Sequence, residues 1–176
     1  LTSYYFPDIN KDYPSVTRNK IEVQMTAQQN IEYKKALNIL SKEGKNSIEN
    51  GSQFTGKMSV FNAFLNLTRR ISNVSSKEET SPKLDKILKM CKNGPKPIII
   101  YSNWLKSGIY PISKLLEKNK ISHFSFTGKN TDKQKKDIVD KYNKRKIDVI
   151  LLSSSGAEGL DLKNTRQIHI MEQHWN

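Results

Sequence analysis

The chain has 176 residues, and its 30 lysines and arginines outweigh its 17 aspartates and glutamates to give a formal net charge of +13. Its single cysteine, Cys91, excludes an internal disulfide and a multi-cysteine zinc site, and no apolar run approaches the about 20 residues of a membrane-spanning helix. Because no signal-peptide pattern opens the chain, we expect a soluble cytoplasmic protein of one domain, or one domain with an appendage.

Residues 1–80 predict helices separated by polar loops. Thr26 followed by Gln29 has the spacing of a capping box, which favours a helix start at that point. The expected elements are, in order, an irregular aromatic connector (1–13), a short strand (16–25), a helix (28–42), a loop (43–56), a second helix (59–71) and a second loop (72–80). This part of the chain therefore predicts a mainly helical connector with flexible loops.

From residue 81 onward the pattern becomes that of an α/β protein. Ser81-Pro82 starts a helix, and the compact apolar run Ile98-Ile99-Ile100 is typical of a strand that is covered on both faces. Helices are expected at 81–91, 107–118 and 132–143, and strands at 97–101, 122–126, 147–152 and 167–171. This alternation predicts right-handed crossovers and a three-layer domain with a mostly parallel sheet.

Small polar residues follow three of the predicted strands. They are Ser102 and Asn103; Thr127 and Gly128; and Ser153, Ser154, Ser155 and Gly156. Each group alone is more typical of a helix cap or a turn. Because the carboxyl ends of parallel strands share one edge of a sheet, three such groups together predict a binding site for phosphate or ribose at that edge.

These segments resemble the second RecA-like domain of superfamily-two helicases and Snf-type translocases. The string IIIYSNW is similar to motif IV, FSFTGKNTDKQKKDIVDKYNK to the following strand, Thr-Gly turn and helix, and VILLSSSGAEGLDLKNTRQIHIMEQHWN to motif V with its next strand. The closing Trp175-Asn176 is similar to the Trp-Asn of Snf-type enzymes. The phrase GAEGLDLKNTRQIHIME resembles the helicase-like NTPases and early transcription factors of large cytoplasmic DNA viruses of the poxvirus type.

The resemblance implies a fold, a function and partners. Residues 81–176 would be a RecA-like domain, preceded by the connector 1–80. The eight residues at the strand ends would hold the phosphate backbone of DNA or RNA, and Gly159 and Asp161 would contact the nucleotide. The full-length protein would use ATP and Mg²⁺, and its partners would be the first RecA-like domain and a viral RNA polymerase, in the cytoplasm, the virion or a viral factory.

The sequence lacks several parts of a complete motor. It contains no G-x-x-x-x-G-K-[ST] string, no Asp-Glu pair after an apolar strand, and no Arg-x-x-Arg after Trp175-Asn176. We therefore expect a fragment truncated before its arginine motif, with no catalytic residue and no Mg²⁺ ligand of its own, which alone hydrolyses no ATP. Two alternatives stay open: a non-catalytic module that binds nucleic acid or a polymerase, and an unrelated Rossmann-like nucleotide-binding domain.

Several other residues allow two interpretations. The net charge and the basic residues between Lys133 and Lys146 suit nucleic acid, but they suit a solvated outer face as well. Trp104 could stack on a base or pack internally. His123 and His169 lie inside apolar runs, which favours satisfied core histidines over metal ligands.

Overall fold

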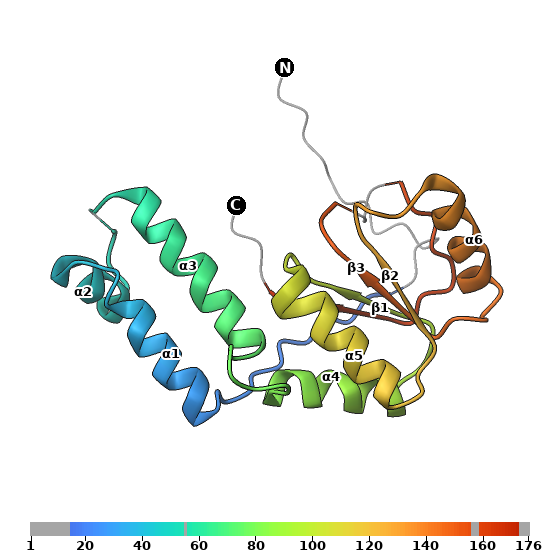
Figure 1. Cartoon of the computed structure of the whole chain (residues 1–176), viewed down its shortest axis with the longest axis horizontal. Helices are drawn as coiled ribbons and strands as arrows, with labels where there is room; N and C mark the ends of the chain where they lie inside the picture. Colours follow the sequence, from blue (N-terminus) through green and yellow to red (C-terminus); the bar gives the residue numbers. More distant parts are fainter. Residues whose placement is uncertain (1–14, 55, 156–158, 173–176) are drawn as a thin grey trace, which may run out of the picture.

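The computed structural model describes residues 15–54, 56–155 and 159–172 of the chain. Three helices, α1, α2 and α3, form one end of the molecule, and a sheet with its covering helices forms the other (Figure 1). None of the helices in the described part is long and apolar enough to cross a bilayer.

The sheet has four parallel strands. They are β1 (Ile98–Tyr101), β2 (His123–Phe126), β3 (Val149–Leu152) and β4 (Gln167–Ile170), in the spatial order β2-β3-β1-β4. All three ladders are parallel and in register, so that Phe126 lies opposite Leu152, Leu152 opposite Tyr101, and Tyr101 opposite Ile170. The predicted α/β fold with a parallel sheet is confirmed.

Helices cover both faces of this sheet. The helices α4 (Pro82–Asn93) and α5 (Tyr110–Lys118) pack on one face, where Ile100 and Leu151 point, and α6 (Asp132–Asn143) packs on the other, where Ile99 and Ile150 point (Figure 1). Because side chains alternate between the two faces of a strand, a strand covered on both sides must be apolar at every position. This explains the continuous apolar runs of β1 and β3.

The helix starts follow the predicted capping signals. Ser81 accepts a hydrogen bond from the backbone N–H of Leu84, and Pro82 occupies the first turn of α4. Thr26 and Gln29 form the predicted capping box at the start of α1 (Ala27–Leu37), and Thr131 and Gln134 form a second one, which was not singled out from the sequence, at the start of α6. One helical feature was not expected: a π-helical turn, η1 (Leu105–Ile109), precedes α5.

The helical connector contains α1 (Ala27–Leu37), α2 (Lys42–Asn50) and α3 (Met58–Asn73) around a small apolar core. The prediction of a loop at 43–56 was wrong, because α2 occupies most of it. Ser41 caps the start of this helix, and Gly51, with φ of +65°, ends it in the left-handed conformation. Since α2 has few apolar residues, its periodicity gave no signal.

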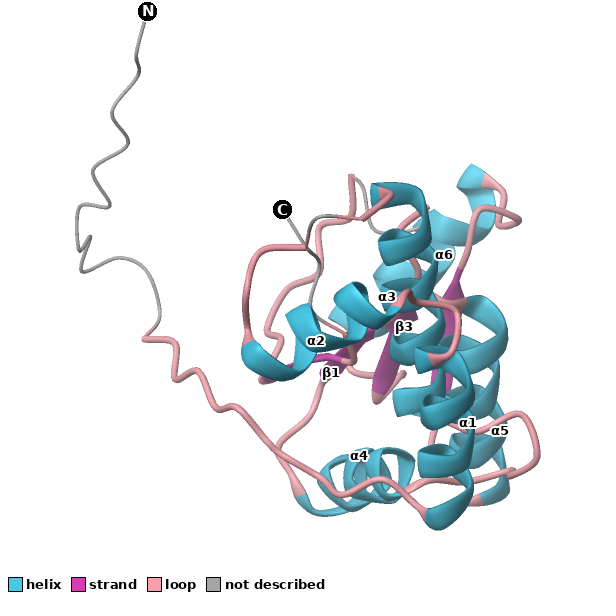
Figure 2. Cartoon of the chain, turned by 90° about the vertical axis from the view of Figure 1, so that its left-hand side faces the viewer, coloured by secondary structure: helices cyan, strands magenta, loops and turns pink. Residues whose placement is uncertain are grey.

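The predicted strand at 16–25 was also wrong. This segment pairs with no strand among the described residues, and it passes α4 on its way to α1 (Figure 2), with Ile21 46% exposed and Val23 37% exposed. Alternating apolar and polar residues give a segment one apolar face, but a strand also needs a neighbouring strand with which to form hydrogen bonds. Without that neighbour, this extended segment forms no regular strand.

The ring of His169 on β4 is the basis of a prediction about stability and pH. Its Nε2 is buried and makes no hydrogen bond to the described residues, and burial lowers the pKa of His169 below its ordinary value of 6.5. The unfolded chain therefore takes up a proton at a pH where the folded chain does not, so stability should fall as the pH falls from about 6.5. We expect urea midpoints between pH 5 and 8 to show this loss, and the change His169→Leu to reduce the slope. An unchanged slope in the variant would contradict this assignment.

Candidate nucleic-acid interface

The carboxyl ends of the four strands lie at one edge of the sheet. Because the ladders are parallel and in register, the segments after β1, β2, β3 and β4 all leave from this edge. Backbone hydrogen bonds continue the ladders for one residue, from Ser102 N–H to Leu152 O and from Ser153 N–H to Phe126 O, at 3.0 and 3.1 Å. We call residues 102–103, 127–129, 153–155 and 172 the strand-end rim.

The segments after β2 and β3 touch each other. A Cβ placed on Gly128 would lie 3.2 Å from Ser155 Oγ and 3.5 Å from Ser155 Cβ. The structure thus brings Thr127, Gly128 and Ser155 together although they are far apart in the sequence. Gly156, predicted to belong to the same group, lies outside the described residues.

The polar residues of these two segments form an inner and an outer layer. Ser153 is buried and donates its hydroxyl proton to Phe126 O at 3.2 Å, and the amide of Thr127, also buried, donates to Asn130 Oδ1 at 2.6 Å. Gly128, Lys129, Ser154 and Ser155 are exposed. The inner residues therefore hold the turns in shape, and the outer ones are available to a ligand. Lys129 was not singled out from the sequence, but it directly follows the Thr-Gly turn.

The two predicted residues after β1, Ser102 and Asn103, are likewise an inner and an outer residue. Ser102 is fully buried, and its hydroxyl donates to the carboxylate of Glu172 at 2.7 Å. Asn103 is half-buried, and its backbone N–H donates to the same carboxylate at 3.0 Å. The structure therefore gives Ser102 an internal role in place of the predicted contact with a ligand, because its hydroxyl does not reach the surface.

Glu172 is a residue that the sequence reasoning missed. It is the second residue after β4 and is only 5% exposed. Besides Ser102 and Asn103, it accepts a hydrogen bond from the side-chain amide of Asn73, the last residue of α3. The available signal was its position, since a carboxylate that follows a predicted strand of a parallel sheet lies at the same edge as the other three groups.

Lys83 completes this buried group from the first turn of α4. Its Nζ donates to Ser72 Oγ, Asn73 Oδ1 and Met171 O at 3.1, 2.9 and 3.0 Å. Burial lowers the pKa of Lys83, and the negative charge of Glu172 opposes that shift. The lysine thus places a positive charge near the buried carboxylate, and it joins α3 and α4 to Met171, the residue that follows β4.

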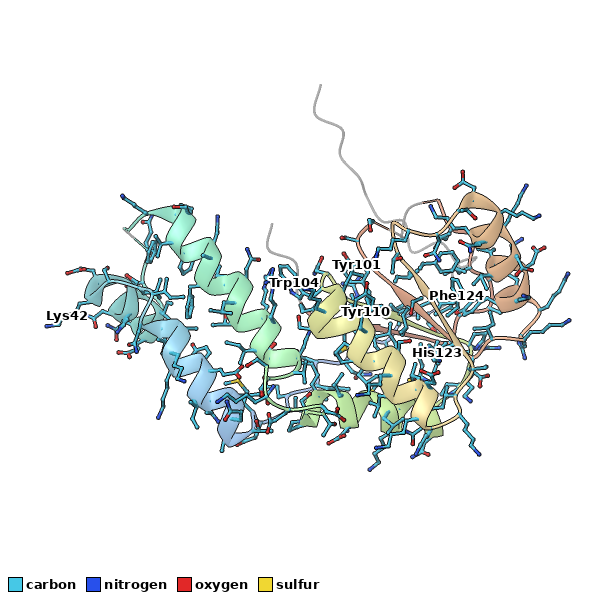
Figure 3. The ribbon with its side chains drawn as sticks, in the orientation of Figure 1. Lys42, Tyr101, Trp104, Tyr110, His123 and Phe124 are labelled. Atoms are coloured by element: carbon cyan, nitrogen blue, oxygen red, sulfur yellow. The ribbon has the colours of Figure 1, made fainter. Side chains whose placement is uncertain are left out.

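Trp104 lies beside the rim, between the connector and the sheet. The guanidinium of Arg70 is 4.1 Å from the centre of its ring, and Trp104 and Tyr110 line a groove of about 700 Å³ between α3 and α5 (Figure 3). One face of the indole is therefore covered by a cation, which favours a packing role for Trp104 on that face.

Of the two predicted nucleotide-binding residues, Asp161 lies apart from the rim. Gly159 and Asp161 are exposed, and the carbonyl of Asp161 accepts a hydrogen bond from Asn143, the last residue of α6, at 3.0 Å. The turn at Thr127 precedes the first residue of the same helix. Asp161 is thus held at the opposite end of α6 from the rim, and a ligand that reached it would approach over the α6 side of the sheet.

The described residues offer no evident site for a metal ion or a triphosphate. Within residues 15–54, 56–155 and 159–172, no three His, Cys, Asp or Glu side chains come together. The string GSQFTGK at 51–57 has the glycine and lysine spacing of a phosphate-binding loop, but Met58 stands where Ser or Thr is needed. It also follows helix α2 rather than a strand, and Phe54 within it stacks on Phe61.

The histidines differ from each other. The ring of His123 is bonded at both nitrogens, to Ser113 Oγ at 2.8 Å and to the carbonyl of Ile121 at 2.9 Å, as expected for a satisfied histidine. His169 was expected to be satisfied too, but its buried Nε2 has no partner among the described residues.

Gly108 provides a test of the buried group. It lies in η1 against Ser102, and an added Cβ would come within 2.7 Å of Ser102 Cβ. The change Gly108→Ala should therefore push Ser102 away from Glu172 and lower the free energy of unfolding by about 1–3 kcal/mol. Gly128→Ala is the matched control, because Gly128 is exposed, and its effect should stay within about 0.5 kcal/mol. Denaturant titration measures both, and equal losses would contradict the tight contact.

Comparison with known proteins agrees with this geometry. The family model for the helicase conserved C-terminal domain matches residues 81–176. The protein L538 of Acanthamoeba polyphaga mimivirus, a candidate ATP-dependent RNA helicase, is 41% identical over 179 residues, which cover 99% of this chain and 40% of the mimivirus protein. A termination factor NPH-I homolog of African swine fever virus is 27% identical over 151 residues, which cover 56% of this chain and 21% of that protein. The chain thus spans less than half the length of these relatives.

Solved structures show the same fold. The C-terminal domain of the Sulfolobus solfataricus SWI2/SNF2 ATPase has a TM-score of 0.66 and 19% sequence identity, over 86% of this chain and 70% of that one. The ATPase core of the same archaeon in complex with dsDNA also has a TM-score of 0.66, with 20% identity, over 86% of this chain and 34% of that one. The RecA-like fold inferred from the sequence is confirmed, and with the match over residues 81–176 it establishes that this chain belongs to the helicase conserved C-terminal domain family.

Proposed function

We propose that this chain is the second motor domain of an ATP-dependent helicase or translocase, and that its strand-end rim holds the phosphate backbone of a nucleic acid. The observation that carries the proposal is the close approach of Gly128 to Ser155, since a Cβ placed on Gly128 would lie 3.2 Å from Ser155 Oγ. This contact joins two segments that are separate in the sequence into one exposed surface. Membership of the helicase family supports the proposal.

The chemistry of the exposed layer suits phosphate groups. Ser154 and Ser155 carry hydroxyls, Lys129 carries a positive charge, and Gly128 lets a backbone approach closely. Asn103 adds a half-buried amide at the end of the neighbouring strand. Such groups contact the backbone of a nucleic acid and not the base edges, so binding should have little sequence preference. Gly156 stays part of the proposed grip.

ATP would bind between this domain and a first RecA-like domain. The nucleotide role of Gly159 and Asp161 stays a prediction, with the constraint that the nucleotide would then lie toward the α6 side. Since the described residues contain no acidic cluster, we propose that the Mg²⁺ ligands belong to the first domain. Closure and opening of the cleft between the two RecA-like domains around ATP would then move the strand-end rim along the nucleic-acid strand.

The names of the relatives suggest a setting. Mimivirus and African swine fever virus proteins are among them, one of which is named a termination factor homolog, and a Drosophila melanogaster relative is named transcription termination factor 2. We therefore propose a role in the transcription of a large DNA virus, in the cytoplasm, with the virion or the viral factory as specific sites and a viral RNA polymerase as a partner.

The binding proposal is tested with a fluorescently labelled single strand and fluorescence anisotropy at several salt concentrations. The affinity should fall with salt with a slope of roughly −0.7 per phosphate contact, because each contact releases counterions. Gly128→Tyr should weaken binding about tenfold or more, since the ring would occupy the place of the phosphate. Lys144→Ala, which removes an exposed charge at the far end of α6, should weaken it less than about threefold. Equal effects of the two changes would refute a specific grip at the rim.

The motor proposal is tested by ATP hydrolysis. This chain alone should show no hydrolysis stimulated by DNA or RNA, because the phosphate-binding loop and the acidic pair are absent from its sequence. The longer protein that contains it should hydrolyse ATP and be stimulated by nucleic acid. If the longer protein binds nucleic acid but hydrolyses nothing, the non-catalytic binding module is the correct reading.

A further inference from the structure

We propose that Glu172 is a positioning residue that orients Asn103 toward the nucleic acid and couples the helical connector to the rim. The inference rests on the proposed function, because it assigns a role in the same grip. It assigns a role to a residue that does not touch the nucleic acid. It also connects α3 through hydrogen bonds to the surface where the nucleic acid would bind.

Among the residues that the structure describes, the hydrogen-bond partners of the Glu172 carboxylate are all donors. One oxygen accepts from Ser102 Oγ at 2.7 Å and from the amide of Asn73, and the other accepts from Asn103 N at 3.0 Å and Asn103 Nδ2 at 3.5 Å. An ionised carboxylate has acceptors on both oxygens and no donor, so it is the side chain that satisfies all of these groups together. Bonds of this charge-assisted kind are also stronger than neutral ones.

Asn103 is oriented from two sides. Its Oδ1 accepts a hydrogen bond from Tyr101 Oη at 2.9 Å, and its Nδ2 points to Glu172. An amide nitrogen carries two N–H groups, and this arrangement directs only one of them to Glu172. The half-buried Asn103 therefore keeps one donor that can reach a phosphate, in an orientation that depends on the carboxylate.

The same carboxylate ties the rim to α3. Asn73 is fully buried, donates to Glu172, and accepts from Lys83 Nζ at 2.9 Å. A shift of α3 would therefore move Glu172 or break its bond to Asn73. Since Asn73 has no exposed surface, any effect of its removal on nucleic-acid binding must pass through its neighbours.

An amide in place of the carboxylate would break this arrangement. In the variant Glu172→Gln the new N–H₂ group faces either the backbone N–H of Asn103 or the amide of Asn73, and both are donors. Turning the amide over relieves one conflict and creates the other. The variant keeps the size of the side chain while it releases one of the two partners.

The experiment measures the affinity of this chain for a labelled single strand in the wild type and in the variants Glu172→Gln, Asn103→Ala, Asn73→Ala and Glu172→Gln/Asn103→Ala. We expect each single variant to bind about five- to tenfold more weakly, as for the loss of one typical hydrogen bond. In the Asn103→Ala background, Glu172→Gln should add less than about twofold, because it acts through Asn103.

Gln29→Ala is the control variant, because it should destabilise the fold while Glu172 and Asn103 keep their positions. Gln29 is 1% exposed and donates to the carbonyl of Ile71 at 2.7 Å, so it is a buried polar residue of the connector with no bond to Glu172. It should lower the melting temperature and leave the affinity within about twofold at a temperature where all variants are folded.

The outcomes separate the two proposals. If the wild type does not bind single strands at all, the proposed function fails. If the wild type binds and Glu172→Gln or Asn73→Ala binds equally well, or if the losses from Glu172→Gln and Asn103→Ala multiply in full, the positioning role fails while the proposed function stands. A loss of affinity in Gln29→Ala equal to that in Asn73→Ala would also overturn it, since general destabilisation would then explain both.

Discussion

The parallel register of the sheet is the constraint on which the candidate site depends. β3 lies between β2 and β1, and all three ladders end level with one another, at Phe126, Leu152, Tyr101 and Ile170. Because a parallel connection must return across the sheet before the next strand begins, every strand here ends at the same edge. A shift of β2 against β3 by a single residue would exchange the side chains that face α6 for those that face α4 and α5, and it would separate Gly128 from Ser155.

Polar groups at this edge are divided between structure and function. A buried hydroxyl or amide without a partner is costly, so residues that close the edge must be hydrogen-bonded internally. Ser102, Thr127 and Ser153 meet this requirement through Glu172, Asn130 and Phe126 respectively. Because these inner residues fix the turns, the outer residues can face a ligand without a further loss of conformational freedom on binding. This is a physical reason for consecutive polar residues after a β-strand.

Most of the α/β part could be predicted from the sequence, and the reasons are physical. The runs at β1 and β3 are apolar because both faces of those strands are covered, and Ser81 marks a helix start by a local hydrogen bond. The two failures have different causes. The polar helix α2 is stabilised by local features, its Ser41 cap and its Gly51 end, which its few apolar residues did not reveal. The segment at 16–25 lacks the neighbouring strand that its alternation would require, and pairing with a strand is a contact distant in the sequence.

The candidate site could be predicted only in part, for a similar reason. Sequence reasoning places polar residues at the edge, but it cannot tell which hydroxyls are used internally, because the partner of Ser102 is 70 residues away. Glu172 was missed because a lone carboxylate after a strand has no local pattern. Its role depends on Asn73, 99 residues away, and no spacing rule connects the two.

Net charge and rim geometry make separate contributions to the proposed binding. The formal net charge of +13 is spread over the surface, and the described rim residues include one exposed lysine, Lys129. The spread charge attracts a polyanion from any direction, and this attraction weakens with salt. Neutral hydroxyls and amides at fixed positions add little attraction at long range, but they determine where the backbone lies. A motor that moves along a nucleic-acid strand needs fixed contact positions as well as long-range attraction. The spread charge alone would hold the nucleic acid without determining how far the motor moves in each cycle. The carboxylate of Glu172 contributes to the fixed contact positions, because it holds the neutral amide of Asn103 in place. The positive charge of the nearby Lys83 lies inside the protein and offsets the charge of this carboxylate.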